Sequence, residues 1–191
     1  MDECRQAICR WGRHLWEAGL VRGSSGNLSC RVGEEFLITP AGSSLFSLEP
    51  DQLVLARLDG GESSVPEARR TSSETPLHRL VYQRVPGARA VVHTHSPYAA
   101  ALSRRPWPPA QGLPEGLSLE RVDSHAPGSQ ALAEAVSGAL AAGAQGVLLE
   151  GHGVVTASES LEEAVIRAEL VEEWAQIYCI SLLLERRGEG A

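Results

Sequence analysis

The chain has 191 residues, of which 43% are hydrophobic and 21% are charged, and its formal net charge is −7. We therefore expect one globular domain over residues 1–191, and the negative charge disfavours a nucleic-acid partner. The sequence contains no apolar stretch of about 18 residues, so we expect no membrane span.

All 17 basic residues are arginines. The absence of lysine excludes Schiff-base chemistry through a lysine amine, and it excludes a P-loop, which needs a lysine. The four cysteines, Cys4, Cys9, Cys30 and Cys179, form no CxxC motif. We interpret them as reduced thiols of a cytoplasmic protein.

The N-terminal half predicts two helices with an extended region between them. Apolar residues at helical spacing predict a helix over 3–18, with Asp2 as its N-cap. The segment 23–48 is loop-rich and extended, and 52–62 ("QLVLARLDGGE") is typical of a strand with a hairpin turn. Residues 72–87 predict a helix that is capped by serine and ended by a proline-glycine pair.

The C-terminal half predicts buried strands flanked by helices. Residues 88–95 ("ARAVVHTH") are typical of a buried strand, and 145–157 ("QGVLLEGHGVVTA") form a second buried strand region. The proline-rich stretch 106–116 predicts a surface loop. The expected helices cover 96–103, 129–142 and 158–187, the last with a capping box from Ser158 to Glu162 or nearby. Strands in the middle with helices around them indicate an α/β domain.

Two histidines stand one residue apart at the end of the strand predicted over 88–95. Alternate residues of a strand share a face, so the imidazoles of His93 and His95 should point the same way. Two neutral rings on one face make a natural pair of metal ligands. On spacing alone, two solvent-facing histidines at a strand end are an equally good interpretation.

His152 and Glu74 extend this pair to a candidate metal site. His152 lies between two glycines after an apolar run, and Glu74 follows two serines at a predicted helix start. Three imidazoles and a carboxylate suit zinc, or manganese, cobalt or iron. Taken singly, His152 is more often a hydrogen-bonded turn residue, and Glu74 is more often a charge that stabilises a helix N-terminus.

A second set of residues is suited to a phosphate group. The segments 25–29 ("SGNLS"), 39–44 ("TPAGSS") and 71–73 ("TSS") offer hydroxyls and backbone N–H groups exposed by glycine. Because lysine is absent, we expect such neutral donors to hold an anion. Segments of this kind are usually simple turns, so each is weak evidence alone.

Several segments together resemble the class II aldolase/adducin family. They are, in order, "GNLS", "ITPAGSS", "SSETPLHRLVY", "AVVHTHSPYAAALS" and "GHGVV" followed by "SLEEA". The resemblance covers roughly residues 5–185. It implies a single-domain α/β/α fold with a central, mostly antiparallel sheet, and a C4 homotetramer with active sites at subunit contacts.

The resemblance also implies roles for individual residues. The zinc ligands of the family fall on Glu74, His93, His95 and His152. Its phosphate-binding loops fall on Gly26-Asn27, Ala41-Gly42 and Ser72-Ser73.

The resemblance implies reversible cleavage of a ketose 1-phosphate, such as L-fuculose 1-phosphate, to dihydroxyacetone phosphate and an aldehyde. A divalent metal stabilises the enediolate without an iminium, which suits a lysine-free chain, and Glu74 would move the proton. Family members that are epimerases, dehydratases or decarboxylases use a similar enolate, so the ligands do not choose among them. A non-catalytic, adducin-like binding role is a remote alternative.

One segment departs from the aldolases of the family, which donate a proton through a tyrosine of a neighbouring subunit. Here the matching stretch is "DSHAPGS" (123–129), with Ser124 about where the tyrosine would stand and His125 beside it. Serine has too high a pKa for this task, whereas an imidazole titrates near neutral pH. We therefore predict that His125 supplies the proton across the subunit contact. The alternative is that Tyr98 or water does so.

Overall fold

The computed structural model describes residues 1–61, 70–106 and 112–188. Within them, seven strands form one sheet in the order β3-β2-β1-β4-β7-β6-β5. Neighbouring strands are antiparallel except β5 and β6, which are parallel. The expected α/β fold with a mostly antiparallel sheet is thereby confirmed. The strands are β1 (Asn27–Val32), β2 (Glu35–Ile38), β3 (Val54–Arg57), β4 (Ala90–Thr94), β5 (Leu119–Val122), β6 (Gly146–Leu149) and β7 (Gly153–Ser158).

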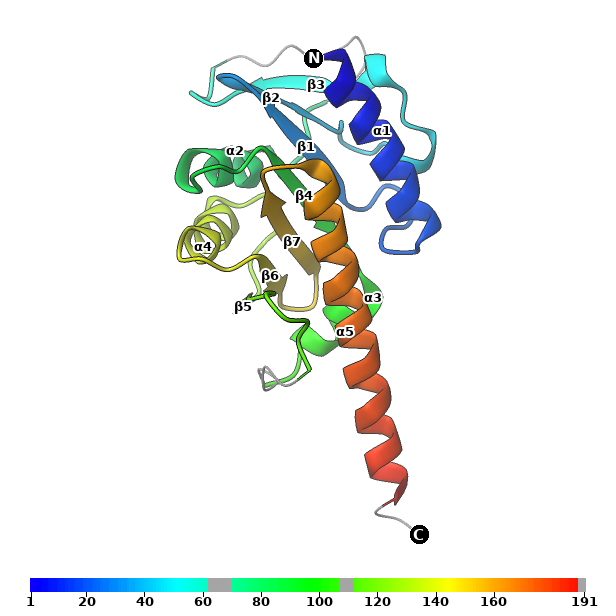
Figure 1. The fold of residues 1–191 in the computed structure, drawn as a ribbon. Coiled ribbons are helices and arrows are strands. Elements are labelled where there is room, and N and C mark those ends of the chain that lie inside the picture. Colours follow the sequence, from blue (N-terminus) through cyan, green and yellow to red (C-terminus); the bar gives the residue numbers. More distant parts are fainter. Residues whose placement is uncertain (62–69, 107–111, 189–191) are drawn as a thin grey trace.

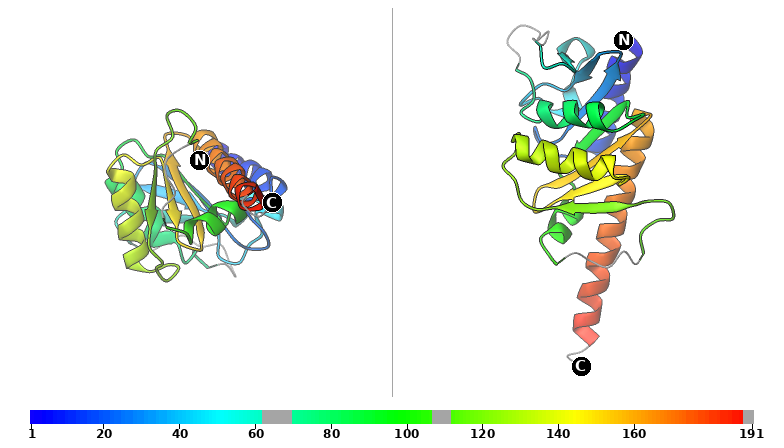
Figure 2. Two further views of the ribbon diagram at one scale, coloured as in Figure 1. Left: turned by 90° about the horizontal axis from the view of Figure 1, so that it is seen from below. Right: turned by 90° about the vertical axis from the view of Figure 1, so that its left-hand side faces the viewer.

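Helices cover both faces of this sheet (Figure 1). Helices α2 and α4 pack side by side on one face, while α1 and α5 lie on the other, where α3 packs against α5 (Figure 2). The C-terminal part of α5 extends beyond the rest of the protein. The helices are α1 (Asp2–Glu17), α2 (Thr75–Arg84), α3 (Pro97–Ser103), α4 (Gln130–Ala141) and α5 (Leu161–Gly188), and the short 3-10 helices are η1 (Leu45–Ser47) and η2 (Pro50–Gln52).

Strand β4 lies at the centre of the sheet, between β1 and β7. Its side chains alternate between the two layers, as a strand requires. Val91 packs in the core on the α2 and α4 side with Leu77, whereas Val92 packs on the α1 and α5 side with Val165. By the same alternation His93 is on the face of Val91, and it is fully buried. The central strand thus carries the first candidate ligand.

Two helix starts differ from the sequence-based expectation. Helix α1 begins at Asp2 itself, so Met1 and not Asp2 stands at the N-cap position, and no side chain caps the helix. Helix α2 has Glu74 at its N-cap, one position after the expected serines. Ser72 still supports this turn, because its Oγ accepts a 3.2 Å hydrogen bond from the backbone N–H of Glu74.

At the start of α5, the cap expected at Ser158 or nearby is supplied by Ser160. Ser158 is the last residue of β7 and is therefore held in the sheet. Ser160 caps the helix instead, and its Oγ accepts a 3.1 Å hydrogen bond from the backbone N–H of Glu163. The serine and glutamate side chains of Ser158 and Glu163 are themselves hydrogen-bonded.

The remaining sequence-based expectations concern the strands of the C-terminal half, the predicted loop and the cysteines. The buried region predicted over 145–157 is a hairpin of two strands, β6 and β7, and the edge strand β5 had no counterpart in the sequence prediction. The stretch 107–111 of the predicted loop lies outside the described residues. The four cysteines are free, as expected.

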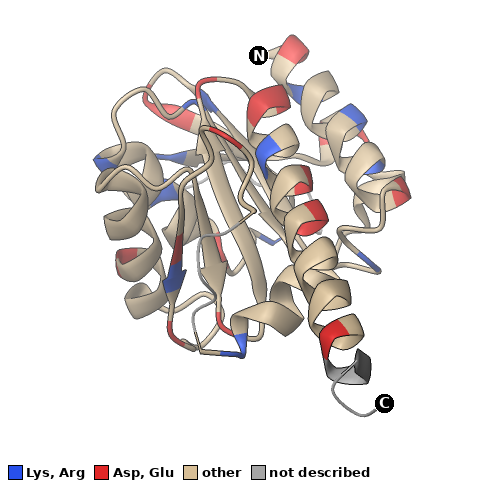
Figure 3. Cartoon of the chain, turned by 60° about the horizontal axis from the view of Figure 1, so that its bottom comes forward, with Lys and Arg blue, Asp and Glu red and all other residues tan. Residues whose placement is uncertain are grey.

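Charged residues of both signs occur in the helices and loops of the described part of the chain. In the view of Figure 3, arginine (blue) and acidic (red) segments are both spread along these elements. Among the helices that the structure describes, none combines the length and the apolar character that crossing a bilayer requires.

Candidate metal and phosphate site

The end of β4 presents His93 and His95 to a common space. The Nδ1–H of His93 donates a 3.0 Å hydrogen bond to the carbonyl oxygen of Val154 on the neighbouring strand β7. A backbone carbonyl can only accept, so this bond leaves Nε2 of His93 free as a ligand atom. His95 is the first residue beyond the strand, and its ring centroid lies 4.8 Å from that of His93.

The turn between β6 and β7 supplies His152. Gly151 precedes it with a φ of +66°, a backbone conformation that favours glycine. Ser103, at the end of α3, fixes this turn: its Oγ accepts a 2.8 Å hydrogen bond from the N–H of Gly151 and lies 3.1 Å from the carbonyl oxygen of Leu149. The turn that carries His152 is thereby held by α3, an element remote from it in sequence.

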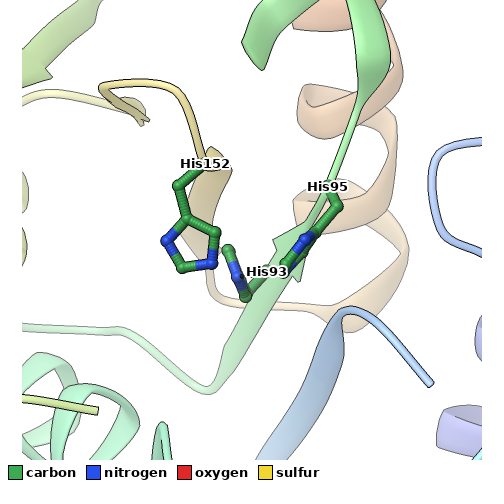
Figure 4. A group of neighbouring side chains, drawn as sticks. All are labelled: His93, His95 and His152. Atoms are coloured by element: carbon green, nitrogen blue, oxygen red, sulfur yellow. Dashed lines mark hydrogen bonds between the residues drawn. The ribbon is translucent and has the colours of Figure 1, made fainter. Parts of the chain in front are cut away.

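The three imidazoles converge (Figure 4), and one ligand atom from each lies within 4.8 Å of the others. The Nε2 atoms of His93 and His95 are 3.1 Å apart. Two imidazole nitrogens on a tetrahedral zinc ion are expected about 3.3 Å apart, from Zn–N bonds of about 2.0–2.1 Å. The three side chains therefore fit a divalent ion.

The protein keeps these rings in the form that binds metal. Burial, with smaller effects of His95 and His152, holds the pKa of His93 well below its usual range. Burial lowers the pKa of His95 to about 4 and also lowers that of His152. All three imidazoles are consequently neutral at pH 7, with lone pairs available for a metal.

Glu74 borders the same cavity but is not part of the three-histidine group. Its Oε1 accepts a 3.1 Å hydrogen bond from the N–H of Gly128, while its Oε2 is buried without a partner. Burial raises the pKa of this carboxyl group. A buried oxygen with no partner is costly unless a ligand satisfies it, so Oε2 is free to meet a metal ion or a substrate proton.

The phosphate-binding residues expected from the sequence line this cavity too. It encloses about 230 Å³. Its lining includes all six, namely Gly26, Asn27, Ala41, Gly42, Ser72 and Ser73, together with Glu74, His93, His95 and His152. At Gly26, with a φ of +75°, a Cβ would lie 2.9 Å from the carbonyl oxygen of His93, so only glycine fits here. The structure thus joins the two candidate sets in one site.

His125 lies in a second, adjoining cavity of about 570 Å³. This cavity shares Pro127 and His152 with the first one, and Ser124 and Arg104 also line it. His125 is half-buried and lines this second cavity, whereas the phosphate-binding residues line the first. The predicted role of His125 across a subunit contact stays a prediction.

Sequence reasoning missed the contribution of the Pro127-Gly128 turn. Gly128 has a φ of +73°, and a Cβ on it would lie 2.7 Å from the carbonyl oxygen of Ser73. This close approach brings its N–H to Glu74. The proline-glycine pair signalled a turn, but no local pattern indicated that the turn packs on a segment more than 50 residues away.

Known proteins are similar to this chain in sequence and in fold. The profile of the Class II Aldolase and Adducin N-terminal domain matches residues 6–179. A 3-oxo-tetronate 4-phosphate decarboxylase of Cupriavidus necator is 34% identical over 186 residues, which are 93% of this chain and 84% of the relative. An L-fuculose phosphate aldolase of Methanococcus maripaludis is 36% identical over 174 residues, 89% of this chain and 91% of the relative.

A solved structure agrees with these similarities. The L-fuculose-1-phosphate aldolase of Thermus thermophilus superposes with a TM-score of 0.76 at 32% identity, over 98% of this chain and 96% of that one. The profile match, the relatives and the fold all lead to one assignment. The chain belongs to the class II aldolase and adducin family.

Proposed function

We propose that the protein is a zinc-dependent lyase that cleaves a ketose 1-phosphate of the L-fuculose 1-phosphate type into dihydroxyacetone phosphate and an aldehyde. The observation that carries this proposal is a single cavity in which three neutral histidines, the unpartnered Oε2 of Glu74 and the glycine- and serine-rich loops meet. The loops suit a phosphate group, and the histidines suit zinc, with cobalt or manganese as alternatives.

The reaction breaks the C3–C4 bond of the ketose, and the electron pair of that bond becomes an enediolate beside the phosphorylated carbon. A divalent ion, when bound, supplies the positive charge that stabilises this enediolate. The C4 hydroxyl must lose its proton as C4 becomes an aldehyde, and we assign that proton to His125. Glu74, beside Ser72 and Ser73, then delivers a proton to C3 and completes dihydroxyacetone phosphate.

A decarboxylase is a second candidate, and the segment 123–129 favours it because it contains no tyrosine. When a 3-oxo acid such as 3-oxotetronate 4-phosphate loses carbon dioxide, the C1–C2 bond breaks and the same enediolate of dihydroxyacetone phosphate remains. The carboxylate leaves as carbon dioxide, so no hydroxyl proton has to be removed from the leaving group. A site without a strong acid or base there could therefore still carry out this reaction. The relative from Cupriavidus necator is named as such a decarboxylase.

Arg104 also bears on this choice. Its guanidinium lies against the backbone of Gly151 and donates a long, 3.4 Å hydrogen bond to the carbonyl oxygen of that residue. Arg121, by contrast, is paired with Glu150 at 2.9 Å. A carboxylate at the end of the substrate opposite the phosphate would find Arg104 in the second cavity.

A quaternary arrangement belongs to the proposal as well. We propose a homotetramer, because apolar side chains on the outer part of α5 are exposed in the single chain. They are Ile177, Ile180, Leu183 and Leu184. A partner subunit would remove this apolar surface from water.

The deciding experiment is a panel of substrates assayed with added zinc, cobalt or manganese. Ketose 1-phosphates and 3-oxotetronate 4-phosphate are compared for release of dihydroxyacetone phosphate. In parallel, proton exchange of dihydroxyacetone phosphate with deuterated water reports the shared half-reaction. Release from a ketose 1-phosphate supports the aldolase, and release from the 3-oxo acid alone supports the decarboxylase. Neither release nor exchange with any ion would refute both, and a purified protein that retains no divalent ion would indicate a binding role.

A further inference from the structure

We propose that His78 is a positioning residue that fixes the side-chain amide of Asn27 with its N–H groups toward the phosphate-binding cavity. The inference rests on the proposed function, because it concerns how that cavity holds a phosphate group. It assigns a task to a buried histidine that is neither a candidate metal ligand nor part of the cavity lining.

Four polar side chains form a continuous chain beneath the cavity. The Nε2 of His78 lies 2.5 Å from Oδ1 of Asn27, and its Nδ1 lies 2.6 Å from Oγ of Ser29. The same Oγ lies 2.6 Å from the hydroxyl of Tyr82. His78 and Ser29 are fully buried, and Tyr82 and Asn27 are nearly so. Water therefore offers these groups no alternative partners.

The chemistry of each group determines which partner donates in each of these hydrogen bonds. An amide oxygen only accepts, so Nε2 of His78 must carry the hydrogen and donate it to Asn27. The ring of His78 is fully buried, which favours its neutral form with a single N–H. Its Nδ1 must then accept from the hydroxyl of Ser29, and that oxygen accepts in turn from Tyr82.

The opposite direction contradicts the placement of the Asn27 amide. If the amide of Asn27 were flipped, it would donate to His78, His78 would donate to Ser29, and Ser29 would donate to Tyr82. The structure places Oδ1 of Asn27, which can only accept, against Nε2 of His78. The first direction is therefore the one that the side-chain positions support.

The orientation matters because the cavity has few strong attractions for an anion. No arginine occurs among the described residues that line it, and the chain has no lysine. Neutral donors must therefore do most of the binding. With Oδ1 held by His78, the amide nitrogen of Asn27 is left for the cavity. A flipped amide would instead present an oxygen to the phosphate, and the two would repel each other.

The inference is tested on zinc-loaded protein by calorimetric titration with inorganic phosphate and with dihydroxyacetone phosphate. Asn27→Asp keeps an acceptor for His78 but removes the N–H donors, and we expect affinity to fall about tenfold or more. His78→Leu should show a similar fall, because the amide is no longer held. His78→Gln, whose amide can donate to Oδ1, should recover most of the affinity. His14→Leu, far from the cavity, is the matched control, and zinc content should be unchanged throughout.

Two outcomes would overturn the inference. One is unchanged phosphate affinity in His78→Leu while Asn27→Asp loses it, and the other is an equal loss in His78→Leu and His78→Gln. Nitrogen-15 NMR of the histidine rings tests it independently of binding, even if a variant fails to fold. The wild-type His78 ring must be the neutral tautomer with hydrogen on Nε2. A wild-type protein with this tautomer that binds neither probe would refute the proposed function and leave the orientation of Asn27 supported.

Discussion

The backbone N–H of Gly128 holds Oε1 of Glu74 at 3.1 Å, while Oε2 of the same carboxylate is buried without a partner. Oε1 therefore positions the side chain, while Oε2 can contact a metal ion or a substrate. Glutamine at this position would keep an oxygen that accepts from Gly128 and would replace only Oε2.

We predict that Glu74→Gln retains most of its substrate binding but loses proton exchange of dihydroxyacetone phosphate. The amide cannot take or deliver the proton, and the loss of a general base typically costs about 10²- to 10⁴-fold. Exchange is followed by NMR in deuterated water, with zinc content measured on the same sample. Unimpaired exchange in the variant would remove Glu74 from the role of base.

The three-histidine group predicts that His93→Ala loses metal and activity together. His93 is fully buried and its Nε2 is 3.1 Å from that of His95, so its loss removes one of the three converging imidazoles. Zinc per chain is measured by elemental analysis after dialysis, and His14→Ala serves as the control histidine. The assignment fails if the His93→Ala protein still holds one zinc per chain with unchanged affinity.

Much of this site could be predicted from the sequence because its signals are local. The spacing of His93 and His95 directly indicates a shared strand face, and the glycines around His152 indicate a turn. The strands that carry them were predicted from apolar runs. Edge strand β5 was missed, since "LERV" is only four residues long and carries two charges.

What the sequence could not indicate are contacts between distant segments. Ser103 fixes the turn of His152, and Gly128 reaches Glu74, yet neither residue stands in a pattern that names its partner. The residues that cap these helices could not be assigned in advance for a related reason. Several serines precede α2 and α5, and only the extent of the sheet and the packing of the turn select one of them.

We expect His125→Ala to separate the two candidate reactions. If His125 takes the C4 hydroxyl proton, cleavage of a ketose 1-phosphate falls by roughly 10²-fold or more, while proton exchange of dihydroxyacetone phosphate stays nearly intact. Decarboxylation of 3-oxotetronate 4-phosphate should not change, because no such proton is involved. Equal cleavage rates in the variant and the wild type would refute the role of His125.

Glu172 is a second buried carboxylate, and its effect should be structural. Its two oxygens accept hydrogen bonds from the backbone N–H groups of Tyr98 and Ala99, at 3.0 and 2.9 Å, at the start of α3. In Glu172→Gln one acceptor becomes a donor that faces a donor, so we expect a loss of about 1–3 kcal/mol in the free energy of unfolding. Glu173→Gln, at the neighbouring exposed position, is the control and should change little. Urea titrations of both variants measure the difference, and equal stabilities would contradict it.

The buried His78 predicts a specific dependence of stability on pH. Burial lowers its pKa to about 3 in the folded chain, whereas an unfolded histidine titrates near about 6.5. Between these values the unfolded chain binds a proton that the folded chain does not, so stability falls as the pH is lowered through this range. From pH 7 to pH 5 this single group should lower the free energy of unfolding by about 2 kcal/mol.

The variant His78→Gln lacks the titrating group. Without metal, its free energy of unfolding should therefore fall by about 2 kcal/mol less than that of the metal-free wild type over the same pH interval. The other buried histidines are common to both proteins and cancel in the comparison. Urea titrations at the two pH values, at one protein concentration, measure the difference, and parallel losses in the two proteins would show that His78 is not buried in its neutral form.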